Sequence, residues 1–251
     1  MATTTKGVWN LNEVMEQIRK NEWVTYDSNN DPHELWSWGN NNAGELGINN
    51  NISRSSPVQV PGSLWCDVSI GENFLATRCD NTLWLAGINN YAQSGSDVVS
   101  NISSPTQISG TSWCRVQATS NQSSLFAIRS DNTLWSWGEN SIGNLAQSDL
   151  VDRSSPTQIP GTTWCDIRSY ASHVLAVQSD NTLWAWGNNT NGHLGQSDRV
   201  HRSSPVQIPG TTWRKVAVGC CFSLGLKTDN TLWSWGTNTD GQLGVNDRVH
   251  R

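Results

Sequence analysis

The chain has 251 residues, which is long enough for one large repeat domain with a sizeable core. The formal net charge is -5, charged residues make up only 15%, and no run of Lys and Arg occurs, so we expect no nucleic-acid partner. Hydrophobic residues make up 35%, but 15 Trp argue against disorder, because disordered chains avoid aromatic residues.

No part of the sequence has the length and apolarity of a membrane-spanning or secretory segment. No window approaches the roughly 18 consecutive apolar residues of a transmembrane helix. The first residues, MATTTKGVWNLNEV, lack the apolar stretch of a signal peptide. We therefore expect a protein made in a cytoplasm, with no membrane partner.

Residues 1–33 differ in kind from the rest of the chain and predict a short helical attachment segment. Asn10 and Glu13 have the spacing of a helix-capping box, and apolar residues then follow at helical intervals. A helix of about three turns needs a surface to pack on, which is either the first repeat or a partner protein. For the second case, the candidate partner-binding residues are Val8, Trp9, Leu11, Val14, Met15 and Ile18.

Residues 34–251 contain a repeat that three separate markers define. Each marker recurs at intervals of about 49 residues, which is in the range of propeller blades. The Trp of a Leu-Trp pair recurs at Trp36, Trp84, Trp135, Trp184 and Trp233. The Pro of Ser-Ser-Pro recurs at Pro57, Pro105, Pro156 and Pro205, and a third Trp recurs at Trp65, Trp113, Trp164 and Trp213.

The local sequence within one repeat predicts four strands. Residues 164–167, 173–177 and 182–186 are short, apolar and β-prone, and a tight turn at Asp180 and Asn181 separates the last two. Residues 204–208 form the fourth strand, with Pro205 at its start, where it costs no ladder hydrogen bond. The fold class is therefore all-β, a β-propeller of four-stranded blades.

The end of each third strand resembles a known family of repeats, those of the regulator of chromosome condensation. The motif reads WGNNNAGELG (38–47), WGENSIGNLA (137–146), WGNNTNGHLG (186–195) and WGTNTDGQLG (235–244). The second copy, residues 86–95, lacks the Trp. The family also carries a His at the start of the strand that precedes the hairpin turn. Only His173 matches it here, and Asn73, Ser124 and Phe222 occupy the equivalent places. The resemblance implies a propeller and little about function.

The repeats do not add up to a whole number of blades. The Leu-Trp strand occurs five times and the other three strands four times each, which gives about four and a half repeats. Residues 247–251 are identical to residues 198–202, after which the earlier copy runs into Ser-Ser-Pro. Three explanations stay open: a fragment of a longer protein, which we favour, a small four-bladed ring, or an arc completed by another chain.

Cysteine spacing does not indicate a metal site. Cys66, Cys114 and Cys165 each follow a Trp at equivalent repeat positions, so we expect them on separate units as small buried hydrophobes. Cys220 and Cys221 form a vicinal pair, and no Cys/His spacing is typical of zinc. We predict neither a metal nor a cofactor.

Catalysis also lacks support in the sequence, so we predict that the chain is not an enzyme. No nucleophile-elbow, zinc-protease or phosphate-loop motif occurs, and the five His are scattered. Four Asp recur, but each falls in a hairpin turn, where Asp favours the turn itself: Asp80, Asp131, Asp180 and Asp229. The strand Trp residues, such as Trp135 and Trp137, are expected to pack between blades rather than to bind sugars.

The leading hypothesis for function is a non-enzymatic structural or binding module. Residues 7–23 resemble the N-terminal segments of structural proteins from marine tailed phages, which implies a virion appendage assembled in the host cytoplasm. Its partners would be other virion subunits or a host surface. The alternatives are a glycan-binding lectin and, as the repeat family's name suggests, a guanine-nucleotide exchange factor.

Overall fold

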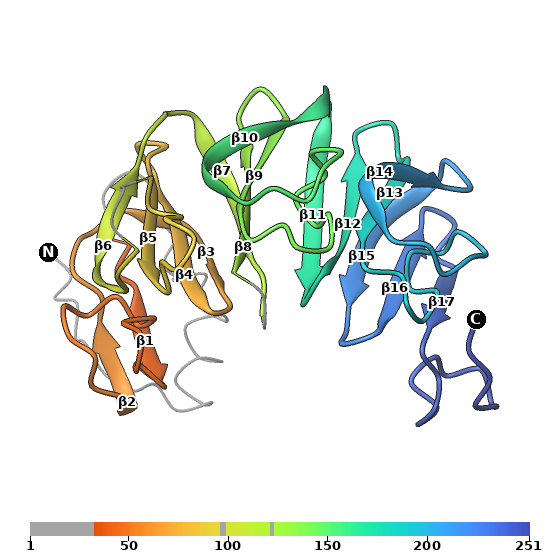
Figure 1. Ribbon diagram of the computed structural model, residues 1–251, viewed down its shortest axis with the longest axis horizontal. Coiled ribbons are helices and arrows are strands. Elements are labelled where there is room, and N and C mark those ends of the chain that lie inside the picture. Colours follow the sequence, from red (N-terminus) through yellow and green to blue (C-terminus); the bar gives the residue numbers. More distant parts are fainter. Residues whose placement is uncertain (1–32, 96–98, 121–122) are drawn as a thin grey trace, which may run out of the picture. The chain divides into compact units, whose positions relative to one another are not determined.

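The computed structural model describes residues 33–95, 99–120 and 123–251, and these form five antiparallel sheets (Figure 1). No helix occurs in these stretches, and so none of their residues lies in a helix that could cross a membrane. The predicted N-terminal helix, with its candidate residues from Val8 to Ile18, lies outside the described residues.

Each sheet is a meander of strands that follow one another in the chain. Sheet 1 contains β1 (Trp36–Gly39) and β2 (Arg54–Gln59). Sheet 2 contains β3 (Trp65–Ile70), β4 (Asn73–Arg78), β5 (Leu83–Gly87) and β6 (Ile102–Ile108). Sheet 3 contains β7 (Trp113–Ala118), β8 (Ser124–Arg129), β9 (Thr133–Gly138) and β10 (Arg153–Thr162). Sheet 4 contains β11 (Trp164–Tyr170), β12 (His173–Gln178), β13 (Leu183–Gly187) and β14 (Arg202–Ile208). Sheet 5 contains β15 (Trp213–Val218), β16 (Phe222–Lys227) and β17 (Leu232–Gly236).

The hairpin turn between the second and third strands has the predicted chemistry. Between β12 and β13, Asp180 Oδ1 accepts hydrogen bonds from the Thr182 backbone N–H at 3.0 Å and from its hydroxyl at 2.7 Å. Asn181 takes a positive φ of 63°, which Asn tolerates better than most residues. The same arrangement surrounds Asp80, Asp131 and Asp229. The recurring Asp is therefore a turn residue.

The fourth strand begins earlier than the sequence predicts. β14 starts at Arg202, which pairs with Gly187, and regular pairing resumes only at Val206 with Ala185. Pro205 therefore lies inside the strand, in the irregular stretch between these two pairs, and not at its start. The irregularity is a bulge in which the ladder is already interrupted, so the missing N–H of Pro costs no hydrogen bond there.

The core lies between neighbouring sheets, where an aliphatic face packs on a Trp-rich face. Between sheets 4 and 5, Leu175 and Leu183 contact the cluster that contains Trp213. Between sheets 2 and 3, Trp137 is fully buried and Trp135 packs against the same cluster, as predicted. One indole removes roughly 200 Å² from water, worth at most about 5 kcal/mol, which explains how a chain with few hydrophobic residues forms a core.

The cysteine prediction is wrong in two places. Cys66 is exposed and forms a disulfide with Cys79 at the end of the β3–β4 hairpin, and Cys114 is exposed as a free thiol. Cys165 is half-buried and packs against the core between sheets 4 and 5. Side chains alternate between the two faces of a strand, so a residue that follows a buried Trp faces the other way.

Candidate binding surface

The loop after each third strand is held by one buried asparagine. Asn189 is fully buried, its side-chain N–H donates to the Asp198 carbonyl at 2.9 Å, and its Oδ1 accepts the Leu194 N–H at 2.9 Å. The corresponding asparagines make the same two bonds in the loops of sheets 1, 3 and 5: Asn41, Asn140 and Asn238. This amide replaces the backbone partners that a loop lacks, so the loop has a fixed shape.

In sheets 3, 4 and 5, the second Trp of the third strand donates a hydrogen bond to the loop of the preceding sheet. Trp186 Nε1 donates to the Asn144 carbonyl at 2.9 Å, and Trp235 Nε1 donates to the His193 carbonyl at 2.9 Å. Trp137 makes the equivalent bond to Gln93. Sheet 2 has Ala86 at this position, so the departure from the motif removes this bond between sheets 1 and 2. In sheets 3, 4 and 5 the Trp of the motif is thus a contact between sheets and not a ligand-binding group, whereas Trp38 of the first copy is exposed.

In four of the five loops, two positions beside a glycine are solvent-accessible; the first is always a polar residue (Asn, Ser or Thr), and only the second differs in every copy. The first of them lies two residues before the loop glycine, and the second directly precedes that glycine. They are Asn42 and Ala43, Ser141 and Ile142, Thr190 and Asn191, and Thr239 and Asp240. A fixed frame that carries varied exposed side chains is typical of repeat proteins that bind a partner.

The structure brings together two histidines that the sequence leaves 20 positions apart. His173 begins β12 and is 1% exposed, His193 lies in the loop after β13 and is 3% exposed, and their rings are 4.5 Å apart. Burial, with a smaller contribution from His193, lowers the pKa of His173 to about 3. Burial also lowers the pKa of His193 to about 4. Both imidazoles are therefore neutral at pH 7.

This histidine pair lies at the interface between sheets 4 and 5. The Ser223 hydroxyl of β16 donates to the His193 carbonyl at 2.8 Å and lies 3.4 Å from His173 Nε2. Solvent does not reach either ring, so the pair cannot exchange protons with a substrate. We assign it a role in packing between the sheets.

A group of possible metal donors also forms only in the folded chain. Ligand atoms of His33, Cys66 and Cys79 lie within 4.8 Å of one another. The two sulfur atoms are joined in a disulfide, and a disulfide is not a thiolate ligand. Spacing along the sequence does not indicate this cluster, because 33 residues separate His33 from Cys66.

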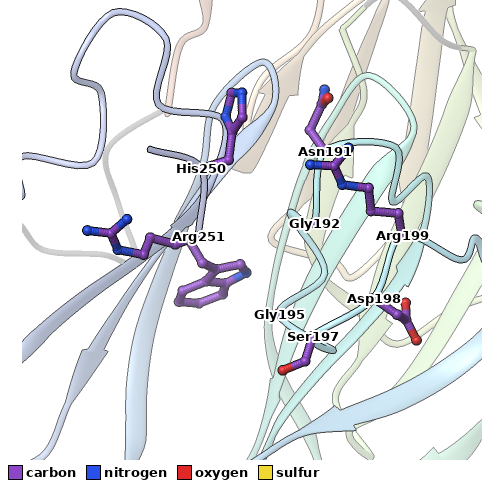
Figure 2. A pocket seen from close by; sticks show the side chains of 9 residues that line it. Asn191, Gly192, Gly195, Ser197, Asp198, Arg199, His250 and Arg251 are labelled. Atoms are coloured by element: carbon purple, nitrogen blue, oxygen red, sulfur yellow. The ribbon is translucent and has the colours of Figure 1, made fainter. Parts of the chain in front are cut away.

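A cavity of about 380 Å³ lies between the loop of sheet 4 and residues 250–251 (Figure 2). Asn191, Ser197 and Arg199 line one side of it, and His250 and Arg251 line the other. The Arg251 guanidinium points away from the space and pairs with Asp247 at 2.5 Å. Ser197, Asp198 and His250 also line this cavity, but Asp198 pairs with Arg202 at 2.5 Å and His250 Nδ1 accepts the Asn238 N–H at 2.9 Å, so the acid and the base are both bonded within the fold.

The exposed Trp residues of the described chain do not lie in loops. They are Trp36 and Trp38 on β1 and Trp233 on β17, in the first and last sheets. In the sheets between them, the equivalent Trp residues are buried or half-buried. A Trp exposed in a loop, which would favour a sugar-binding surface, is not found among the described residues.

Comparison with known proteins identifies the repeat. Two models described as Regulator of chromosome condensation (RCC1) repeat match the chain, one at residues 33–77 and 180–226, the other at residues 164–192 and 213–242. None of the curated proteins matches the sequence.

Three solved structures have a similar fold. Human WBSCR16 has a TM-score of 0.74 and 20% identity, over 88% of this chain and 61% of that one. Yeast RCC1 (Prp20) bound to Kap60 has a TM-score of 0.72 and 20% identity, over 87% and 56%. Prp20p from Saccharomyces cerevisiae has a TM-score of 0.74 and 21% identity, over 88% and 57%. The chain thus spans less than two thirds of the length of these proteins. It is an all-β protein built from RCC1-type repeats, with an RCC1-like propeller fold.

Proposed function

We propose that the chain is a non-enzymatic module that binds other proteins through its repeat loops. The observation that carries this proposal is that each loop combines buried residues that fix its shape with accessible residues that are free to contact a partner. A buried asparagine holds each loop, and in sheets 2, 3 and 4 a Trp of the next sheet also bonds to it, while the accessible position directly before the glycine is Ala43, Ile142, Asn191 or Asp240. Such a surface can vary its contacts without any change in the frame.

The placement of the titratable groups supports a binding role over catalysis. The recurring Asp carboxylates accept hydrogen bonds from their own turns, which lowers their pKa values. The buried histidines are neutral and enclosed between sheets 4 and 5. These groups are already used by the fold.

The test compares two variants of the chain in affinity capture from its source cells. The loop variant replaces Thr190, Asn191, Thr239 and Asp240 by Ala. The control variant replaces Ser204 and Gln207 by Ala; both residues are exposed on β14, away from the loops. We expect the loop variant to lose partner proteins that the control retains, with the circular dichroism of both unchanged. Capture of the same proteins by both variants would show that the loops are not the binding surface.

For the biological setting, we propose a virion appendage, on the resemblance of residues 7–23 to structural proteins of tailed phages. That segment would attach the chain to other virion subunits. Immunogold labelling of purified particles tests this, and absence of the protein from purified virions would refute it.

A regulator of the guanine-nucleotide-exchange type is the second candidate, because the fold is shared with Prp20p, whose structure is described together with its binding properties to Gsp1p and histones. A nucleotide-release assay on a small GTPase tests this alternative: acceleration by the chain would favour it over a plain binding module. A glycan array tests the lectin alternative, which the placement of the exposed Trp residues does not favour.

A further inference from the structure

The hairpin of β3 and β4 carries two cysteines whose sulfur atoms the fold brings together. The register of the hairpin shifts between Trp65 and Asp67, so Cys66 lies in a bulge. A bulge turns the side chain that it carries away from the regular alternation of the strand. The Cys79 backbone N–H donates to the Leu64 carbonyl at 2.7 Å, which places Cys79 beside Cys66, and the two cysteines form the disulfide described above.

A histidine from the segment before β1 completes this group. The Trp65 backbone N–H donates to the His33 carbonyl at 3.2 Å, and this bond holds His33 beside the hairpin. A ring nitrogen of His33 and the sulfur atoms of Cys66 and Cys79 all lie within 4.8 Å of one another. His33 is half-buried and both cysteines are exposed, so a reductant and a cation can reach the sulfur atoms from solution.

Comparison with the other repeats shows that two of these three donors replace residues of a different kind. The carbonyl that accepts the N–H of the first Trp of a sheet belongs to His33 in sheet 2 but to an asparagine in sheets 3, 4 and 5: Asn81, Asn132 and Asn181. The position of Cys79 is a hydroxyl residue in those sheets: Ser130, Ser179 and Thr228. Cys66 is matched by Cys114 and Cys165, whose thiols each donate to a backbone carbonyl at 3.3 Å. Imidazole and a second sulfur thus occur together in the one sheet that also has the first sulfur.

Three such donors fit one zinc ion. In a tetrahedral site, zinc lies about 2.3 Å from a thiolate sulfur and about 2.0 to 2.1 Å from an imidazole nitrogen, which places the ligand atoms roughly 3.5 to 3.8 Å apart. The donor atoms of His33, Cys66 and Cys79 are already within 4.8 Å, so small side-chain rotations reach this geometry once the S–S bond is broken. Thiolate and imidazole also favour zinc over magnesium and calcium, which prefer oxygen ligands.

We propose that the reduced form of the chain binds a zinc ion through His33, Cys66 and Cys79, and that the disulfide form does not. A dithiol reductant supplies two electrons and two protons, which break the S–S bond and give two thiols, while the reductant itself becomes a disulfide. The two thiols release their protons as they bind zinc as thiolates, and water takes the fourth position of the tetrahedron. This site goes beyond the proposed protein-binding function and does not depend on it.

The test is a zinc titration of the 251-residue chain in competition with a chromophoric chelator. The chain is first reduced with a dithiol, which is then removed under exclusion of air. We expect one zinc ion per chain, and binding at least about tenfold weaker when the disulfide is intact. Cobalt(II) in place of zinc should give the sulfur-to-metal charge-transfer bands of thiolate ligation, which cysteines with a purely structural role would not produce.

Single variants of the reduced chain locate the site. His33→Ala and Cys79→Ser should each weaken zinc binding at least about tenfold, because each removes one ligand. Cys114→Ser is the matched control, since Cys114 is an exposed free thiol at the position that Cys66 has in sheet 2, and it should leave zinc binding unchanged. Circular dichroism of each variant verifies that the fold is retained.

The vicinal cysteines supply a second control, because the sulfur atoms of Cys220 and Cys221 lie 3.6 Å apart and offer two thiolates of their own. The double variant Cys220→Ser, Cys221→Ser should retain the zinc ion. Its loss in this variant would assign the ion to the vicinal pair and overturn the inference. The inference also fails if the reduced chain binds no zinc up to about 10 μM, if His33→Ala or Cys79→Ser binds zinc as tightly as the wild type, or if the disulfide form binds it equally well.

Discussion

The buried histidine pair makes the stability of the protein depend on pH in a defined window. His173 and His193 are neutral in the folded chain, with pKa values of about 3 and about 4, and would titrate near 6.5 in the unfolded chain. The folded pKa values are depressed, so the unfolded state binds more protons. The stability is fully present above about pH 6.5 and is lost as the pH falls toward the folded values.

The size of the effect follows from these values. Between about pH 7 and about pH 5, a histidine that titrates only in the unfolded state costs about 2 kcal/mol of unfolding free energy. The two residues together give at most about 4 kcal/mol, a large part of the stability of a typical domain. The turn Asp residues have lowered pKa values as well, so their contributions are lost mainly below this window.

Urea unfolding of the wild type and of a His173→Asn, His193→Gln double variant measures this difference. The chain offers both replacements itself, because Asn73 occupies the first position in sheet 2 and Gln242 the second in sheet 5. We expect the wild type to lose about 3 to 4 kcal/mol more than the variant between the two pH values. An equal loss in both proteins would refute the assignment of a neutral buried pair.

Three further substitutions test the frame. Trp186→Phe removes the indole N–H that donates to the Asn144 carbonyl and should lower the free energy of unfolding in urea by about 2 to 3 kcal/mol. An unchanged urea midpoint would contradict this contact between sheets 3 and 4. Asn189→Ala removes the side-chain hydrogen bonds to Asp198 and Leu194, so amide exchange should accelerate from residue 190 to 200, with no change expected in the loop of sheet 3. Cys79→Ser opens the disulfide with Cys66, which should cost about 3 kcal/mol and expose one additional titratable thiol, and a thiol count lower than that of the wild type would contradict the bond.

The strands and turns of this protein are written into short stretches of its sequence. The Asp-Asn-Thr turn, the Leu-Trp strand and the Trp-Gly-x-Asn loop each depend on contacts within about ten residues. The Leu-Trp strand occurs five times in the sequence, and the turn and the loop motif occur four times each. Local chemistry that recurs at a constant period leaves little choice of fold, so four strands per repeat and the RCC1-type resemblance could be predicted.

The sequence-based prediction for the start of the fourth strand is wrong because the hydrogen bonds of that strand depend on a partner strand and a bulge. Arg202 looks like a loop residue until Gly187 is beside it. The role of the motif Trp could likewise not be read from one repeat, since Trp186 donates to a carbonyl 42 positions away.

The candidate sites depend even more on contacts between repeats. His173 meets His193 only because β12 and the loop after β13 both contact β16 at the interface between sheets 4 and 5. Cys66 meets Cys79 only because β3 and β4 are paired in register. Neither pairing has a signal in residue spacing, because backbone register and not sequence distance decides which side chains meet.

The sequence by itself determined the repeat, the strands, the turn residues and the use of Trp as the main core residue, because each of these follows from local propensity and period. Only the tertiary structure decided which histidines are buried and which cysteines are bonded, because these follow from how the paired strands and the neighbouring repeats are placed against one another. Packing between repeats is a property of pairs of sheets, and no single repeat carries the information for it.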